Sequence, residues 1–465
     1  MGSHQPQPPP PLHVAILPNP GMGHLIPLAE FAKLLTTNYG ITVTFLTLDD
    51  SPRINSFIDA LPDTITYIPL LKPSLHDLPP GSKAETYISL IMSRCLPSLR
   101  EVMVKLKATT NLVALIVDLF GTDAFDVATD LEVSPYIMFP STATLLNFMF
   151  HLEDLDRTIQ GEYRDHPQLI RIPGCVPFHG KDLLVPVQDR NDQAYSLFLD
   201  ISTRYKEAAG IFFNSASSIE PGPIKELMSM DRPPVYPIGP LVHDTNSEDD
   251  NSGCVKWLDE RRPGSVLFVS FGSTGRLTAE QFTELAVGLE MSGYGFLWIA
   301  RSPKETGEKG FFNVKSKSDP LLFLPDGFLE RTKEIGLVVD SWAPQLAILK
   351  HAAIGGFLTH CGWNSSLESI VHSVPMIAWP LYAEQKMNAT MLVEELKIAI
   401  RPVVDEKRGL IGREEISRVV REVIEGEEGK KLRLNVKRIA ENAINENSYK
   451  SLDAVVNIWK NSTSI

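Results

Sequence analysis

The stretch GGFLTHCGWNSSLESIV, residues 355–371, joins an apolar segment of strand length to a segment that begins like a helix. A continuous apolar run predicts a strand buried on both faces, and small polar residues directly after it favour a helix start. Strand, turn and helix in this order form the repeating unit of a parallel α/β sheet. The stretch therefore predicts such a unit, with the turn HCGWNS (360–365) at the sheet edge where ligands bind.

Apolar runs of the same kind recur along both halves of the chain, each followed by a helix-like segment. They lie at 13–18, 41–48, 112–120, 135–140 and 210–215, and then at 265–273, 295–301, 336–343, 354–362, 375–380 and 398–404. Two series of buried strands with crossover helices predict two doubly wound α/β domains. The chain length of 465 residues agrees, because a single hydrophobic core stops growing at about 250 to 300 residues.

The predicted boundary between the two domains lies within VYPIGPLVHDTNSEDDNSG (235–253), where prolines give way to an acidic, polar segment. Such a composition cannot pack into a core, so it predicts a linker. We place an N-terminal domain at 12–240, the linker at 241–253 and a C-terminal domain at 254–445. Near the end of the chain, apolar residues recur at helical spacing: Leu432, Val436, Ile439 and Ala443. Residues 446–465 continue this tail and are expected to form a last helix, with Leu452, Val455, Val456 and Trp459 as its apolar residues.

Composition argues against several classes of function. The net charge of −13 opposes binding to a phosphate backbone, so no nucleic-acid partner is expected. No apolar run approaches the roughly 18 residues of a membrane span, and the start of the chain lacks the apolar core of a signal peptide. The cysteines form no CxxC pair, which favours reduced thiols in a cytoplasmic protein over disulfides or structural zinc: Cys95, Cys175, Cys254 and Cys361.

The first apolar run leads into NPGMGHLIP (19–27), whose two glycines permit a tight turn beside a ligand. The spacing lacks the third glycine of the dinucleotide fingerprint, so a nicotinamide cofactor is disfavoured. His24 stands at the mouth of the strand, where it is either a base or a helix-start histidine without a chemical role. Asn19 lies beside the same turn, and its role is open.

Asp118 interrupts the apolar run at 112–120, and a buried carboxylate is costly unless it is paired. If the strand that carries it lies near the first strand, Asp118 accepts the second imidazole proton of His24 and stabilises the imidazolium. The competing interpretation is that Asp118 caps a helix starting near Thr122. The chain has no GxSxG motif, so the nucleophile is expected to be a substrate hydroxyl rather than a serine.

Two turns in the second half combine exposed amides with hydroxyl groups. SFGSTG (270–275) follows a strand, and Thr278 with Gln281 fits a capping box at the next helix start. The donors of HCGWNS (360–365) suit a diphosphate at a helix N-terminus. The alternative for this second turn is an ordinary capping box made by Ser365 and Glu368.

Metal-binding motifs are weak. Asp154-Leu155-Asp156 matches a DxD pattern, but it lies in an amphipathic segment whose charges suit a solvated helix face. The sequence contains neither HExxH nor an EF-hand loop. We therefore expect no metal ion and no bound cofactor, and a diphosphate would be stabilised by the helix dipole and by hydrogen-bond donors.

The segment from WAPQ to AEQ, residues 342–385, resembles the donor signature of plant secondary-metabolite UDP-glycosyltransferases of family 1. Other motifs resemble the same family and its phenol clade, which contains hydroquinone and indoxyl glucosyltransferases: PNPGMGHLIP (18–27), VDLFGTDAFDVA (117–128), PGCVP (173–177), GPLV (239–242), FLPDGFLERT (323–332) and AWPLYAEQKMNA (378–389). The resemblance implies the GT-B fold, in which two Rossmann-like domains face each other and a C-terminal helix crosses back to the N-terminal domain.

The resemblance also implies a role for each motif residue, with UDP-glucose as co-substrate and no metal. Trp342 would stack on the uracil, the backbone of Ala343 would read its edge, and Gln345 and Glu368 would hold the ribose. The diphosphate would be contacted by Ser273, His360, Asn364 and Ser365. The sugar hydroxyls would be bound by Trp363, Glu384 and Gln385, and a glutamine at the last position resembles enzymes that use glucose.

The implied reaction is an inverting transfer that forms a β-O-glucoside, with His24 as general base assisted by Asp118. By family position the acceptor pocket would be lined by Pro20, Glu85, Ile88, Phe120, Phe148 and Leu184. Apolar and aromatic walls suit a small flat phenol or indole such as hydroquinone or indoxyl. Open alternatives are N-glucosylation of anilines, a UDP-sugar epimerase or hydrolase on the same fold, and a non-enzymatic UDP-sugar binder. We expect a cytoplasmic monomer that serves plant secondary metabolism or xenobiotic detoxification.

Overall fold

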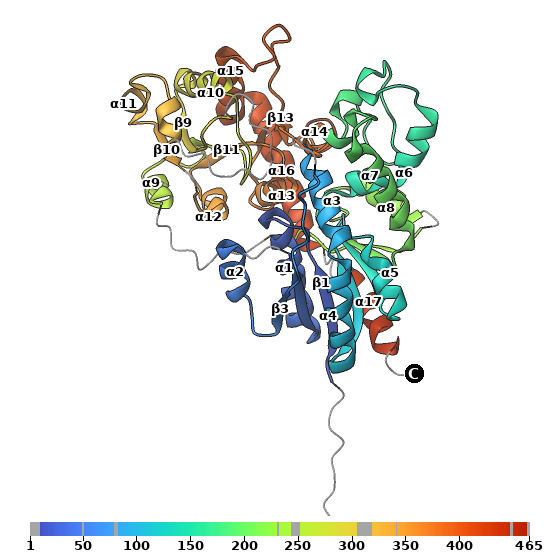
Figure 1. Cartoon of the computed structure of the whole chain (residues 1–465). Coiled ribbons are helices and arrows are strands. Elements are labelled where there is room, and N and C mark those ends of the chain that lie inside the picture. Colours follow the sequence, from blue (N-terminus) through green and yellow to red (C-terminus); the bar gives the residue numbers. More distant parts are fainter. Residues whose placement is uncertain are drawn as a thin grey trace, which may run out of the picture.

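The structure is a computed structural model of the chain, and it describes residues 10–48, 51–78, 82–229, 232–242, 252–304, 319–340, 342–446 and 450–462. The strands form two sheets, one in each half of the chain, as Figure 1 shows. The strand order is β3-β2-β1-β4-β5-β6-β7 in the first sheet and β10-β9-β8-β11-β12-β13 in the second. Within both sheets neighbouring strands are parallel, and the order reverses beside β1 and beside β8. This is the predicted doubly wound arrangement.

The first sheet contains β1 (Leu12–Leu17), β2 (Thr42–Thr47), β3 (Ile65–Pro69), β4 (Asn111–Val117), β5 (Ser134–Phe139), β6 (Gly210–Phe213) and β7 (Val235–Pro237). Its helices are α1 (Met22–Tyr39), α2 (Pro52–Asp59), α3 (Ala84–Arg94), α4 (Leu96–Thr109), α5 (Ala124–Asp130), α6 (Ala143–Thr158), α7 (Gln193–Arg204) and α8 (Pro221–Ser229). Short 3-10 turns are η1 (Tyr163–Asp165), η2 (Gly180–Asp182), η3 (Val185–Gln188) and η4 (Tyr205–Glu207).

The second sheet contains β8 (Val266–Ser270), β9 (Gly295–Ala300), β10 (Gly336–Asp340), β11 (Ile354–Thr359), β12 (Met376–Ala378) and β13 (Ala399–Ile400). Its helices are α9 (Cys254–Asp259), α10 (Ala279–Ser292), α11 (Phe328–Thr332), α12 (Gln345–Lys350), α13 (Trp363–Val371), α14 (Gln385–Thr390), α15 (Arg413–Glu425) and α16 (Glu427–Asn445). A 3-10 turn η5 (Pro320–Phe323), a π-helical turn η6 (Met391–Glu395) and the last helix α17 (Lys450–Ser462) complete the described elements.

Two strands, β3 and β7, were not predicted. Both lie at an edge of the first sheet, where a strand need not be apolar throughout. β3 exposes most of its residues, and β7 has only three residues and ends in Pro237. β7 also lies inside the stretch 235–253 that we assigned to the domain boundary, so that stretch begins as a strand. Most of the predicted linker at 241–253 falls outside the described residues.

Each sheet is covered on both faces, because alternate residues of its strands enter different hydrophobic clusters. In β1, Val14 and Ile16 pack with α1 and α17, whereas Ala15 and Leu17 pack with α3, α4 and α6. In β8, Val266 and Phe268 pack with α12, α13 and α16, whereas the alternate residues pack with α10 and α15. Burial on both faces explains why the strand sequences are continuously apolar.

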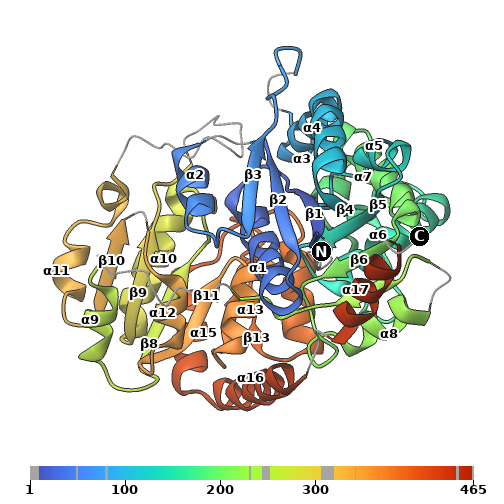
Figure 2. The ribbon, with the colours of Figure 1, turned by 90° about the horizontal axis from the view of Figure 1, so that it is seen from below.

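The last helix, α17, belongs to the second half of the chain by sequence but packs on the first sheet. Figures 1 and 2 show it in red beside elements of the N-terminal half, and it contacts β4 and β7. Its buried residues, Leu452, Val455, Val456 and Trp459, join the cluster of β1 and α1. The Trp459 ring meets Tyr136 of β5 edge-on at 5.5 Å. The apolar spacing that predicted a helix here is therefore the face that docks on the N-terminal half.

The loop at 214–220, between β6 and α8, contacts described residues that flank the two connections between the halves. Beside the first crossing, the Asn214 side chain accepts from the Leu241 amide at 2.6 Å and donates to the Leu241 carbonyl at 3.1 Å. Beside the second, the Glu446 carboxylate accepts from the backbone amides of Ser217 and Ser218, each at 2.8 Å. Ala216 and Ile219 of the loop are buried in the hydrophobic cluster of the C-terminal half. This loop therefore ties the two halves together.

Lowering the pH is expected to destabilise the protein through His13 of β1. Its ring is 6% exposed and contacts the hydroxyls of Thr42 and Thr44 at 2.7 and 3.0 Å, and burial lowers its pKa to about 4. In the unfolded chain a histidine titrates near 6.5, so between about pH 6.5 and 4 the unfolded state binds more protons. The free energy of unfolding should fall by up to about 3 kcal/mol across this window through His13 alone.

Urea unfolding at about pH 7 and about pH 4.5 measures this effect. A His13→Gln variant, which lacks the titrating ring, should lose less stability on acidification than the parent protein. An identical loss in both proteins would show that His13 does not contribute to the acid sensitivity.

Candidate active site

The carboxyl ends of β1 and β4 bring the two predicted catalytic residues together. The strands are neighbours, with Leu17 opposite Val117 in the register. His24 lies in the first turn of α1. The residue before this helix, Gly21, has a φ of 113°, a backbone conformation that favours glycine. Asp118 does not lie within β4, as the apolar run suggested, but directly after its last residue. Both side chains therefore stand at the edge of the sheet where ligands of such folds bind.

The Nδ1 atom of His24 lies 2.9 Å from Oδ2 of Asp118, so the predicted hydrogen bond is present. The Asp118 side chain is fully buried, and the backbone amides of Leu119 and Asn19 donate to it at 2.6 and 3.3 Å. The alternative role of Asp118 as a helix cap is wrong, because α5 begins only at Ala124. With Nδ1–H directed at the carboxylate, Nε2 of His24 is left with a free lone pair.

The electrostatics of this pair favour a basic imidazole. Burial opposes protonation of His24, but the charge and hydrogen bond of Asp118, together with the charge of Glu384, outweigh it, so the pKa of His24 is raised. Its side chain keeps 28% exposure, whereas that of Asp118 has none. Such an arrangement suits a general base, because the buried carboxylate orients the imidazole and would stabilise its protonated form.

The turn HCGWNS leads into α13, which begins at Trp363 with Gly362 as N-cap. The helix thus starts before Ser365, and the capping box of Ser365 with Glu368 is wrong. Instead, the Gln345 side-chain amide donates to Ser365 Oγ at 2.9 Å and to Glu368 Oε2 at 2.6 Å, so these three residues lie together. The first N–H groups of a helix have no intrahelical partner, and no described residue accepts from those of residues 363–365. The start of α13 therefore presents free amides suited to an anion.

The start of α13 touches the turn that carries His24. The Asn364 side-chain amide donates to the Gly23 carbonyl at 2.9 Å, although the two residues belong to different halves of the chain. Beside it, the Trp363 indole N–H donates to the Asn214 carbonyl at 2.7 Å. Trp363 is only 3% exposed, so its indole is not available for the sugar hydroxyls that the resemblance implied, and only its backbone N–H remains. The helix start with its free amides and the turn that carries His24 are thus adjacent.

His360 lies between Gly362 of the same turn and Gly272 of the loop that follows β8. A methyl group on Gly272 or Gly362 would overlap its imidazole ring. Burial lowers the pKa of His360 to about 4, so the ring is neutral at neutral pH, and its Nδ1 is buried without a hydrogen-bond partner. Ser273 is exposed on the neighbouring loop. Loop and turn therefore enclose a neutral imidazole beside the free amides of α13.

The remaining donor-site candidates lie around the same helix. Trp342 is 47% exposed, and Ala343 is buried just before α12. Gln385 is buried, and its side-chain oxygen accepts from the amides of Leu381 and Tyr382 at 2.9 and 3.0 Å. Burial raises the pKa of Glu384, whose carboxylate accepts from Ser141 of the N-terminal half at 3.4 Å. Glu384 therefore also faces the first half of the chain.

The predicted acceptor residues fall into two groups. Four of them share one buried cluster of the N-terminal half: Ile88, Phe120, Phe148 and Leu184. Pro20 lies in the turn before α1, and Glu85 lies in the first turn of α3. Burial, and after it the charges of Asp192 and Glu384, raises the pKa of Glu85. The N-terminal half, which also carries His24, thus contains an apolar cluster and a poorly solvated carboxyl.

Sequence reasoning missed Asn214 and Ser141, which link the two halves at this site. Both follow a strand of the first sheet, β6 and β5 respectively, at the edge that also carries Asn19 and Asp118. A polar residue within two positions of the end of a buried strand is the signal that would have found them.

Other features lie away from this site. Asp154 pairs with Arg157, and Asp156 accepts from Tyr195, so the DxD residues make local contacts. Among the described residues, no three metal-ligating side chains gather into a metal site, and no helix has the length and apolar character needed to cross a membrane. A cavity of about 650 Å³ lies between β13, α15 and α16, and its lining contains none of the predicted site residues: Val393, Glu394, Lys397, Ala399, Ile400, Arg401, Arg418, Glu422, Glu428 and Leu432.

Comparisons with known proteins agree with this architecture. The family model for UDP-glucoronosyl and UDP-glucosyl transferase matches residues 241–456. Hydroquinone glucosyltransferase from Rauvolfia serpentina is 52% identical over 464 residues, covering 97% of this chain and 98% of the relative. A Polygonum tinctorium UDP-glucosyltransferase capable of glucosylating indoxyl, in complex with 3,4-dichloroaniline, superposes with a TM-score of 0.91 at 46% identity, covering 98% and 100% of the chains.

Phytolacca americana UGT2, complexed with UDP-2fluoro-glucose and pterostilbene, superposes with a TM-score of 0.88 at 46% identity over 97% of this chain and 100% of that one. Fold and relatives together define a glycosyltransferase of the GT-B fold with a UDP-sugar as co-substrate. The chain belongs to the plant family-1 UDP-glycosyltransferases.

Proposed function

We propose that the protein transfers glucose from UDP-glucose to a hydroxyl group of a small aromatic acceptor, with inversion at the anomeric carbon. The observation that carries this proposal is the 2.9 Å contact between Asn364 and Gly23. It holds the free helix start, which suits a diphosphate, against the turn that carries the base His24. A donor bound at α13 would then present its sugar to an acceptor beside His24.

In the proposed reaction, Nε2 of His24 takes the proton of the acceptor hydroxyl while Nδ1 stays bonded to Asp118. The acceptor oxygen attacks the anomeric carbon of UDP-α-glucose from the face opposite the UDP, and the bond from that carbon to the diphosphate oxygen breaks. The product is a β-glucoside, and UDP leaves with the electron pair of the broken bond. Asp118 stabilises the imidazolium that forms.

The leaving diphosphate would be stabilised by the amides of residues 363–365, the dipole of α13 and the side chains of Ser273, His360, Asn364 and Ser365. Because His360 is neutral, it would act as a hydrogen-bond donor rather than as a cation. The contact of Gln345 with Glu368 supports their assignment to the ribose, beside Trp342 and Ala343 at the uracil. Glu384 and Gln385 would bind the glucose hydroxyls.

The acceptor is proposed to be a phenol or indole of the size of hydroquinone or indoxyl. Hydroquinone is the acceptor named for the Rauvolfia serpentina relative, and indoxyl is the one named for the Polygonum tinctorium enzyme. The apolar cluster with Phe120 and Phe148 supports a flat aromatic ring. A second candidate is N-glucosylation of an aniline, favoured by the dichloroaniline bound to the Polygonum tinctorium enzyme. In both cases residues 12–240 would hold the acceptor and residues 254–445 the donor.

Incubation with UDP-glucose and a panel of hydroquinone, indoxyl, trichlorophenol and dichloroaniline tests the proposal. Mass spectrometry should show one added hexose per molecule of UDP released, and proton coupling at the anomeric carbon should show the β configuration. Turnover of UDP-glucose without acceptor would instead favour an epimerase or hydrolase. Binding of UDP-glucose without any turnover would contradict an enzymatic role.

A further inference from the structure

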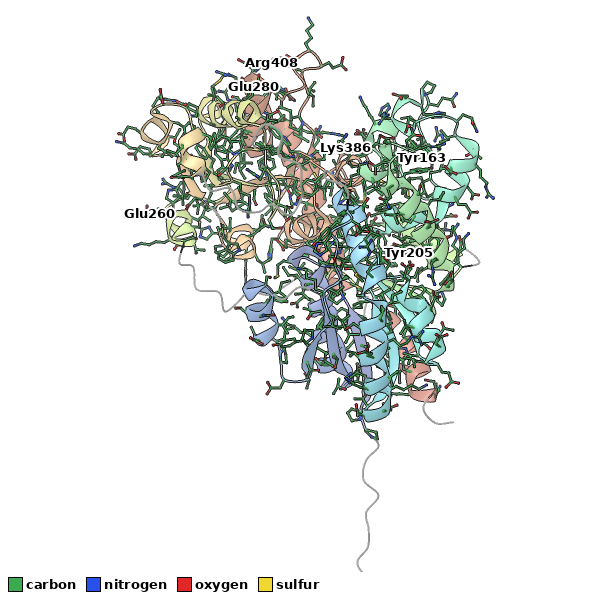
Figure 3. All side chains as sticks on the ribbon, in the orientation of Figure 1. Tyr163, Tyr205, Glu260, Glu280, Lys386 and Arg408 are labelled. Atoms are coloured by element: carbon green, nitrogen blue, oxygen red, sulfur yellow. The ribbon has the colours of Figure 1, made fainter. Side chains whose placement is uncertain are left out.

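Tyr205, the first residue of η4, lies beneath the turn that carries Asp118. It is fully buried, and its hydroxyl donates to the Leu119 carbonyl at 3.0 Å. Its ring is held edge-on by Phe139 at 6.1 Å and by Phe150 at 6.2 Å. Figure 3 labels Tyr205 among the side chains of the N-terminal half. The hydroxyl thus reaches the turn from a rigid aromatic cluster.

The turn at 118–121 is held at several backbone atoms. The Leu119 amide donates to Asp118 Oδ1 at 2.6 Å, and the Gly121 amide donates to the Asp118 carbonyl at 2.9 Å. Both polar backbone atoms of Leu119 are therefore used, the amide by the Asp118 carboxylate and the carbonyl by Tyr205. A displacement of the Leu119 peptide would move the donor that orients Asp118.

The Tyr205 hydroxyl acts as a donor throughout the neutral pH range. Burial, and in addition the nearby charge of Asp118, raises the pKa of Tyr205 well above its ordinary value. A neutral phenol is the form that can donate to a carbonyl oxygen. The Tyr205 hydroxyl therefore keeps its proton, and its hydrogen bond to the Leu119 carbonyl persists, across the neutral pH range.

We propose that Tyr205 is a positioning residue for the transfer reaction: its hydroxyl fixes the Leu119 peptide, and thereby the Asp118 carboxylate that orients His24. The inference rests on the proposed roles of His24 and Asp118. A residue that acts through the base matters only when the base is needed. Removing the hydroxyl should therefore slow transfer to a weakly acidic acceptor and leave transfer to an acceptor that is already anionic nearly unchanged.

The test is Tyr205→Phe, which removes the hydroxyl and keeps the ring. Tyr163→Phe is the matched control, because Tyr163, which is labelled in Figure 3, is also fully buried. Its hydroxyl pairs with that of Tyr195 at 3.2 Å instead of with the turn. Turnover and KM are measured with phenol and with trichlorophenol, at a pH where trichlorophenol is ionised, and thermal unfolding is recorded for each variant. His24→Ala is assayed in parallel to test the base itself.

Tyr205→Phe should lower kcat on phenol by about three- to tenfold, with little change on trichlorophenol and an unchanged KM for UDP-glucose. Tyr163→Phe should lose a similar amount of thermal stability without this acceptor dependence. An equal loss of kcat on both acceptors, or a Tyr205→Phe enzyme as active as the Tyr163→Phe control, would overturn the inference about Tyr205. Neither result would contradict the proposed role of His24 as the base. If His24→Ala retains full turnover on phenol, the proposed base is wrong, and the role of Tyr205 falls with it.

Discussion

Replacing His24 by alanine is expected to lower turnover of a weakly acidic phenol by about 10² to 10⁴, the usual contribution of a general base. The hydrogen bond to Asp118 leaves Nε2 as the only ring nitrogen free to take the acceptor proton, and alanine offers no substitute. An acceptor that is already ionised needs no base, so its turnover should fall much less. Steady-state kinetics with both kinds of acceptor measure the difference.

His351→Ala provides a matched control for this experiment. His351 also lies beside an aspartate, with Nε2 at 3.2 Å from Asp259, but it stands just before the amino end of β11 and not at the carboxyl edge of a sheet. Its loss should leave kcat on both acceptors close to that of the parent enzyme. Near-normal turnover of phenol by His24→Ala would remove His24 from the mechanism.

Replacing Gly362 by alanine should raise the KM for UDP-glucose by about ten- to a hundredfold, because the new methyl group overlaps the His360 ring. The ring is buried between Gly272 and Gly362, so the methyl group displaces it and also disturbs the start of α13. Loss of a hydrogen bond to a charged diphosphate accounts for an effect of this size. Initial rates over a range of UDP-glucose concentrations, with direct titration by UDP, measure it.

Gly412→Ala is the control for backbone effects. Gly412 is likewise the N-cap of a helix, α15, with an extended backbone, and a methyl group there meets no atom closer than 3.6 Å. Its substitution should leave the KM unchanged. If Gly362→Ala binds UDP as tightly as the Gly412→Ala protein, His360 has no part in holding the diphosphate.

The sequence predicted the fold and the meeting of His24 with Asp118 because both depend on a strong local signal. Buried parallel strands are continuously apolar, and polar residues at their carboxyl ends must share one edge of the sheet. The edge strands β3 and β7 escaped prediction because that apolar requirement is relaxed at an edge. Prediction therefore succeeded where burial on both faces constrains the residues.

The errors concern contacts between segments that are distant in sequence. The capping box of Ser365 with Glu368 fitted the local pattern. In the structure both side chains instead accept hydrogen bonds from Gln345, which lies 20 residues before Ser365. The Trp363 indole is bound by Asn214, 149 residues earlier, and spacing within a motif does not reveal such a partner. Local patterns thus located the candidate site but did not show which of its side chains are already bound to other residues of the protein.

The loop at 214–220 has a practical consequence for exchanging halves between members of the family. Its Asn214 carbonyl accepts from Trp363 and its serine amides bind Glu446, so one short segment must match two separate places beyond the linker. In a chimaera joined only in the linker, this loop would meet Trp363 and Glu446 from a different parent. We expect functional hybrids to require that this loop be taken from the same parent as the C-terminal half.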